Sequence, residues 1–238
     1  MRYSRFAGSL IYHFVMRKRK PVNYEIEVTG EPSITRLPKE YADSLVFSLE
    51  LVIYEMLHDE QEEIPDEEKR SQQYRLAAGI YLTCQGRLFF LSGEEFARTK
   101  GGLEDSYNAP IAINRLDWER AWEERELADY YRGLIALRKQ LPGLCDKSPQ
   151  AAERIRTAWK RKGFVGFFVD NRGKGAPDTW KTLCILYNRK EEPVSVPLEG
   201  DGWEVLADGK DSFLWKNPKQ IRKEAQVDPV SILVLGKR

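Results

Sequence analysis

The carboxyl-terminal part of the sequence consists of short runs of β-forming residues that alternate with clusters of turn residues. The runs GFVGFFVD (163–170), TWKTLCILYN (179–188) and PVSILVLG (229–236) are typical, and stretches such as EGDG (199–202) lie between runs. Regularly spaced short strands with glycine, proline, asparagine and aspartate between them are typical of antiparallel sandwiches and barrels. The pattern therefore predicts that residues 150–238 form a separate all-β domain, an antiparallel β-sandwich.

Before this region the apolar residues take helical spacing. Residues 67–86 carry apolar side chains on nearly every face, which predicts a buried helix ending at Gly86. RLFFL (87–91) follows as a short apolar strand of the kind that is buried in a parallel sheet. After a long loop, residues 122–141 predict an amphipathic helix with leucine and tyrosine on one side and Arg and Lys on the other. Helix, buried strand, loop and helix together favour an α/β unit placed before the all-β domain.

Residues 1–66 lack the caps and turns that would set secondary structure in register. PVNYEIEV (21–28) is compatible with a strand and EYADSLVFSLELVIYEML (40–57) with an apolar helix. We therefore divide the chain into an uncertain segment (1–66), an α/β segment (67–149) and the all-β domain (150–238). Our hypothesis for the first segment is that it is foreign or out-of-frame sequence that precedes a truncated gene.

Charge and cysteine content argue against several classes of function. The 38 Lys and Arg residues nearly balance the 37 Asp and Glu residues, so no strong field favours nucleic acid or a membrane surface. No apolar run reaches the ~18–20 residues of a membrane span. The three cysteines are odd in number and form no CxxC pair, so we expect no disulfide framework, metal site or cofactor. Since residues 6–20 do not have the layout of a signal peptide, we expect a cytoplasmic protein.

Two stretches carry a family resemblance: QGRLFFLSGEEFARTKGGLEDSYNAPIAINRLDW (85–118) and YYRGLIALRKQLPGL (130–144). With the residues around them, they resemble the carboxyl-terminal part of pullulanase-type debranching enzymes of the α-amylase clan, over residues 67–238. The resemblance implies that 67–149 is the end of an incomplete (β/α)8 TIM barrel and that 150–238 is the C-terminal β-sandwich. It also implies a glycoside hydrolase that acts on α-1,6-glucosidic branch points of pullulan, starch or glycogen, with an α-glucan polysaccharide as its partner.

The loop after the predicted strand carries side chains that suit sugar binding. In TIM-barrel enzymes the chemistry lies at the carboxyl-terminal ends of the strands, and long loops are often functional. Arg98, Asn108 and Asn114 offer planar hydrogen-bonding groups for sugar hydroxyls, and Tyr107 offers a ring for the apolar face of a pyranose. We therefore predict these four residues as substrate-binding residues.

A structural interpretation of the same loop stays open. Glu94 and Glu95 can form a buried ion pair with Arg98 that seals the rim of the barrel, and Asn108 can be part of the scaffold.

The sequence offers no pair of catalytic carboxyl groups. Retaining glycoside hydrolysis needs two such groups about 5–5.5 Å apart. The resemblance implies that these come from barrel strands that precede residue 67, together with a His-Asp-Asn motif. Val28-Thr29-Gly30 stands where that motif is expected, and His58-Asp59 is followed by Glu60 instead of asparagine. We therefore predict no catalytic residue in this chain and a fragment that is inactive alone.

Two alternatives remain. The first is a non-catalytic carbohydrate-binding or structural β-sandwich module in which Trp159, Trp180, Trp203 and Trp215 contact the glucan. Tryptophans in a sandwich are, however, also ordinary core residues. The second alternative is that the chain binds a separate polypeptide that carries the missing portion of the barrel.

Overall fold

In a computed structural model of the chain, the structure describes residues 67–86, 88, 90–100, 103, 106–148, 150–173 and 180–238. The strand expected over 21–28, the helix expected over 40–57 and His58-Asp59 lie outside the described residues.

The predicted antiparallel strands are confirmed in the carboxyl-terminal part of the chain. Within the described residues they form a six-stranded sheet with the order β1-β2-β3-β8-β5-β6 and a two-stranded sheet, β4-β7. Every pairing in both sheets is antiparallel. The strands are β1 (Ile155–Arg161), β2 (Phe164–Asp170), β3 (Thr182–Asn188), β4 (Val194–Pro197), β5 (Trp203–Asp208), β6 (Gln220–Ile221), β7 (Glu224–Val227) and β8 (Ser231–Lys237).

The two predicted helices are observed as α4 and α7. Asp117 caps the short helix before α7, because its carboxylate accepts from the backbone N–H groups of Glu119 and Arg120. Pro142, which opens α8, follows shortly after the end of α7. The helices are α4 (Glu67–Thr83), α5 (Ile111–Asn114), α6 (Trp118–Glu123), α7 (Arg125–Arg138) and α8 (Pro142–Cys145), with 3-10 turns η2 (Glu94–Phe96), η3 (Ala151–Arg154) and η4 (Leu214–Lys216). No helix among these described residues is long and apolar enough to cross a membrane.

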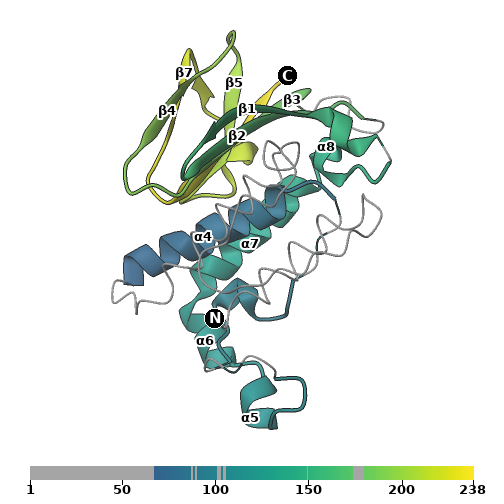
Figure 1. Cartoon of the computed structure of the whole chain (residues 1–238). Coiled ribbons are helices and arrows are strands. Elements are labelled where there is room, and N and C mark those ends of the chain that lie inside the picture. Colours follow the sequence, from purple (N-terminus) through teal and green to yellow (C-terminus); the bar gives the residue numbers. More distant parts are fainter. Residues whose placement is uncertain are drawn as a thin grey trace, which may run out of the picture.

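The described elements stack in three layers (Figure 1). Helices α4 and α7 lie side by side under one face of the six-stranded sheet, and the β4-β7 sheet covers the other face. A methyl group added at Gly79 of α4 would lie 2.6 Å from side-chain atoms of Ile232 in β8, so the helix backbone touches the sheet there. The helices share one apolar core with this face of the sheet. The division into segments at residue 150 stays a prediction.

The strand predicted over 87–91 is not observed at Leu88, Phe90 and Leu91, the described residues of that stretch. A strand is defined by hydrogen bonds to a neighbouring strand, and a barrel strand needs a neighbour on both sides. No strand in the described part of the chain lies next to these residues. Within the described part of the chain, the apolar run therefore has no partner strand.

Candidate functional site

The loop of interest leaves the apolar run through a tight turn at Gly93. Gly93 has a φ of 103°, and a Cβ atom there would lie 2.5 Å from the Cδ atom of Arg98. Its N–H donates to the Glu95 carboxylate at 2.8 Å. Only glycine combines this backbone conformation with so close a neighbour. The turn therefore fixes the direction in which the rest of the loop leaves the helical layer.

Arg98 ties the two ends of the loop together. Its Nη1 atom donates to the carbonyl of Ser92 at 2.9 Å, and its Nη2 atom donates to the carbonyl of Asn114. The prediction that Arg98 forms a buried ion pair with Glu94 and Glu95 is wrong, because the guanidinium donates to these carbonyl groups and to neither carboxylate. The planar fork of arginine suits two acceptors that come from different segments.

Asn114 uses its whole amide group inside the loop. Its Nδ2 atom donates to the carbonyls of Ser106 at 2.7 Å and Ala109 at 3.1 Å. Its Oδ1 atom accepts from the ammonium of Lys100 at 2.5 Å. An amide that is engaged in this way has little capacity left for a ligand. Arg98 and Asn114 thus hold the loop in shape.

Tyr107 and Asn108 occupy the two central positions of a turn. The N–H of Ala109 donates to the carbonyl of Ser106 at 3.1 Å, which closes the turn. The Tyr107 side chain is 83% exposed and Asn108 is also exposed. Neither side chain makes a hydrogen bond to another described residue. The four predicted residues therefore form two pairs, one that supports the loop and one that faces solvent.

Among the described carboxyl groups of this loop, Glu94 has a perturbed pKa. Burial raises the pKa of Glu94, a backbone hydrogen bond at Leu91 opposes the shift, and the neighbouring charge of Glu95 adds to it. Its Oε1 atom is buried without a hydrogen-bond partner. A raised pKa is a property of a general acid, but glycoside hydrolysis needs a second carboxyl group placed across the bond. Glu95 instead accepts the hydrogen bond from Gly93.

Arg138 fixes the corner that precedes the loop. The sequence pattern predicts that Arg138 lies on the polar side of its helix. This prediction is wrong, because the Arg138 side chain is only 9% exposed. Its guanidinium donates to the carbonyls of Leu82 (2.8 Å), Cys84 (2.6 Å), Gly86 (2.7 Å) and Leu144 (3.1 Å). Leu82 lies in the last turn of α4, where carbonyl groups lack partners within the helix, and Cys84 and Gly86 lie in the turn that follows the helix. A cation at this end of a helix is also favoured by the helix dipole.

Comparison with known proteins gives these observations a context, although no protein-family profile matches the sequence. A pullulanase of Bacillus subtilis (strain 168) is 33% identical over 172 residues, which cover 71% of this chain and 23% of the relative. The isoamylase SU1 of Zea mays is 26% identical over 159 residues, or 60% of this chain and 19% of the relative. The chain is related to pullulanase-type debranching enzymes.

Solved structures agree with this relationship. A pullulanase from Bacillus acidopullulyticus superimposes with a TM-score of 0.67 at 28% sequence identity. The superposition covers 74% of this chain and 22% of the pullulanase chain. The apo pullulanase from Paenibacillus barengoltzii gives a TM-score of 0.62 at 34% sequence identity, over 74% of this chain and 26% of the pullulanase chain. The chain thus spans about a quarter of the length of the pullulanases it matches.

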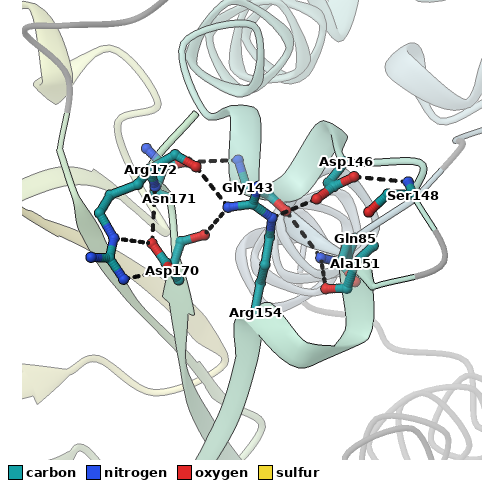
Figure 2. Close-up of polar contacts among 9 residues, drawn as sticks. All are labelled: Gln85, Gly143, Asp146, Ser148, Ala151, Arg154, Asp170, Asn171 and Arg172. Carbon is teal, nitrogen blue, oxygen red and sulfur yellow. Dashed lines mark hydrogen bonds and ion pairs between the residues drawn. The ribbon is translucent and has the colours of Figure 1, made fainter. Parts of the chain in front are cut away.

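In this pullulanase-type chain, a charged network joins the helical layer to the end of β2 (Figure 2). Arg154 donates to the Asp146 carboxylate at 2.5 Å and to the carbonyls of Asp170 (3.1 Å) and Arg172 (2.7 Å). Arg172 in turn donates twice to the Asp170 carboxylate, at 2.9 and 2.7 Å. The pKa of Asp146 is lowered to about 2, mainly by a hydrogen bond from the backbone N–H of Ser148 and next by the hydrogen bond from the Arg154 side chain. The Arg172 hydrogen bond lowers the pKa of Asp170 to about 2.

Two amides extend this network into the interior. Gln85 donates to the carbonyls of Gly143 (3.0 Å) and Ala151 (2.5 Å). Asn171, which is fully buried, accepts from the N–H of Gly143 at 2.9 Å and donates to the carbonyl of Trp180 at 2.6 Å. Sequence reasoning missed this network, because its members are far apart in the chain and form no local motif. Its bonds run between protein groups, which indicates a structural junction.

The tryptophans of the sheet region are not arranged as an exposed platform. Trp180 and Trp203 are 5% and 3% exposed. Their Nε1 atoms donate to the Glu204 carboxylate at 2.6 Å and to the Glu199 carbonyl at 3.2 Å. Trp159 and Trp215 are half-buried. Sugar stacking needs an open ring face, so at least the first two are core residues. Among the described residues, no group of three or more His, Cys, Asp or Glu side chains is placed to hold a metal ion.

Proposed function

We propose that residues 67–238 act as the carboxyl-terminal part of a glycoside hydrolase that debranches α-glucans at α-1,6 linkages in pullulan, starch or glycogen. On this proposal 67–149 is the end of a (β/α)8 barrel and 150–238 is the C-terminal β-sandwich. The relationship to pullulanases and isoamylases supports the enzyme class. Solved pullulanases that match this chain were obtained as complexes with maltose or maltotetraose, which supports an α-glucan ligand.

The turn at Tyr107 and Asn108 carries the proposal. Both side chains are exposed at the tip of a loop whose base is tied by Arg98 and Asn114. An exposed ring can cover the apolar face of a glucose unit, and a free amide can bond to its hydroxyls. A loop that is held by internal bonds loses less conformational entropy when it binds a ligand. We therefore assign the glucan contact to Tyr107 and Asn108, and we assign support of the loop to Arg98 and Asn114.

Hydrolysis requires more than this loop provides. The chemistry needs one carboxyl group as nucleophile and another as general acid. Glu94 has a raised pKa, but Glu95 beside it is held by Gly93. We propose that the catalytic carboxyl groups come from barrel units outside residues 67–238 and that the chain alone does not cleave glucan. The cytoplasmic location stays a prediction.

Affinity electrophoresis in native gels that contain pullulan tests the glucan contact. We expect pullulan to retard the intact chain. Asn108→Ala should weaken binding about two- to twelve-fold, the equivalent of a lost hydrogen bond of ~0.5–1.5 kcal/mol. Tyr107→Ala should also weaken it, whereas Asn217→Ala, an exposed asparagine next to η4, should have no effect.

Two results would overturn the assignment. The first is a chain that pullulan does not retard. The second is retardation that survives both loop substitutions but is lost in Trp159→Ala or Trp215→Ala, which would favour the β-sandwich binding module.

A further inference from the structure

Helix α6 exposes two large aromatic rings. Of the six tryptophans in the sequence, Trp118 and Trp122 are 72% and 71% exposed, and the other four are buried or half-buried. Both belong to α6, and residues four positions apart lie next to each other on one side of a helix. Single exposed apolar residues are normal, but two adjacent indole rings left in water are typical of a binding surface.

The opposite side of α6 is fixed to the base of the loop. Arg120 is half-buried, and its Nε atom donates to the carbonyl of Ala97 at 2.7 Å. Arg120 stands two residues from each tryptophan, which places it on the other side of the helix. The helix is therefore held by one side while the two tryptophan rings face outward.

Each ring is also held by a neighbour. The Phe96 ring lies 6.4 Å from that of Trp118, measured between centroids, at an interplanar angle of 39°. The Arg125 guanidinium lies 5.2 Å from the centre of the Trp122 ring, and its Nη1 atom donates to the Trp122 carbonyl at 3.1 Å. Side chains that are already ordered lose little conformational entropy when they bind a ligand, so the two rings are prepared for a contact.

Charged side chains accompany the rings. Glu119, Glu123 and Arg125 are exposed in the same short stretch of chain. The carboxylates accept hydrogen bonds and the guanidinium donates them. The surface therefore suits a ligand that has an apolar face for an aromatic ring and hydroxyl groups around that face, which is the chemistry of a pyranose.

Two other classes of ligand that contact tryptophan fit this surface less well. Nucleic acid stacks its bases on aromatic rings, but among the exposed residues from 118 to 125 two carboxylates outnumber one cation and repel phosphate groups. The centre of a protein interface is depleted of charged residues, whereas every exposed residue beside the two tryptophans in this stretch is charged. A neutral carbohydrate is the class that the surface favours.

We propose that Trp118 and Trp122 form an aromatic platform that binds an α-glucan chain, with one glucose unit on each ring. Arg125, Glu119 and Glu123 bond to the hydroxyl groups at the edges of these units. The platform is a second contact, separate from the turn at Tyr107 and Asn108. The choice of an α-glucan as the carbohydrate rests on the proposed function.

Quenching of tryptophan fluorescence by iodide, in the intact chain and with maltotetraose as the probe, tests the platform. Iodide reaches exposed indoles, so replacing Trp118 and Trp122 with phenylalanine should remove most of the quenching. Saturating maltotetraose should protect the two rings. Trp122→Ala should weaken binding of the probe by about fivefold or more, since the sugar loses an apolar face to cover, and Trp122→Tyr should weaken it less. Gln226→Ala, on the exposed side of β7, is the control and should change nothing.

Three results would overturn the proposal: rings that iodide does not reach without sugar, no protection by maltotetraose, or an affinity that both Trp118→Ala and Trp122→Ala leave unchanged. Protection by a thymidine oligonucleotide alone would also overturn it. The double variant Tyr107→Ala with Asn108→Ala should keep the protection of the α6 rings, and its loss would contradict a separate platform. The pullulan gels measure the turn residues and this titration measures α6, so failure of either contact can be recognised separately.

Discussion

Replacing Gly79 with leucine tests whether α4 packs on the sheet. Gly79 lies in the middle of α4, where its backbone contacts the buried Ile232 of β8. In a helix that faces solvent, this substitution would stabilise the protein by about 0.8 kcal/mol, because leucine is a far better helix former than glycine. The sign of the change in unfolding free energy therefore reports the environment of this residue.

The structure predicts a loss. A Cβ atom at this position would lie 2.6 Å from both the Cδ1 and Cγ2 atoms of Ile232, and the remaining atoms of leucine need further space. Ile232 is fully buried, and its β-branched side chain has few alternative rotamers. Overpacking of this kind typically costs about 1–3 kcal/mol, which exceeds the gain in helix propensity. We therefore expect Gly79→Leu to lower the unfolding free energy by about 0.2–2.2 kcal/mol.

Equilibrium unfolding in urea measures this change. Ala77→Leu, at an exposed position of the same helix, is the matched control and should stay within about 0.5 kcal/mol of the wild type. The double variant Gly79→Leu with Ile232→Ala should lose less than the sum of the single losses, with a coupling of about 0.5–3 kcal/mol. If Gly79→Leu raises the stability, α4 does not lie on β8 and the three-layer arrangement is refuted.

Three further outcomes follow from the polar contacts. Arg138→Met should lower the unfolding free energy by about 2–5 kcal/mol, because the buried carbonyl groups that accept from the guanidinium lose their donor. Lys139→Met, at an exposed position of the chain, is the control. Equal losses of stability in the two variants would contradict the structural role of Arg138. Asp146 and Asp170 have pKa values lowered from 3.8 to about 2, so they stabilise the fold above pH ~4 and this contribution fades toward pH ~2. Acid titrations followed by circular dichroism should therefore show a shallower loss between these pH values when both are asparagine. Asn114→Ala should speed limited proteolysis of its loop, and an unchanged cleavage rate would remove its supporting role.

Local patterns predicted those parts of the fold that depend on local sequence. Apolar spacing located α4 and α7, and turn clusters separated the strands that the structure shows. Both are signals of short range, set by helical period and by backbone-compatible turn residues.

Long-range arrangement could not be predicted in the same way. β8 lies between β3 and β5, although it is last in the sequence, and nothing in its own residues specifies those neighbours. Arg138 is the instructive case, because charge alone suggested a polar face. It stands four residues after Leu134 and seven after Tyr131, both buried, so helical spacing could have placed it on the core side. The prediction of a strand over 87–91 was wrong at the described residues for a different reason, because an apolar run specifies burial but not a partner strand.

The loop shows the same limit at the level of a site. Residue types identified Arg98, Tyr107, Asn108 and Asn114 as groups able to bind sugar, yet the types do not reveal which of them are already engaged. The hydrogen bonds of Arg98 and Asn114 and the exposure of Tyr107 separate support from candidate contact. That separation depends on tertiary geometry.

The central proposal is that residues 67–238 carry a glucan-contacting loop of a debranching enzyme and that the catalytic carboxyl groups come from outside these residues. Incubating the intact chain with pullulan and measuring released reducing ends tests it most directly. General acid and nucleophile must both be positioned at the bond, so we expect no release above that of buffer alone. Release of reducing ends that Glu94→Gln abolishes would contradict the account, because it would show that the residues of this chain suffice for catalysis.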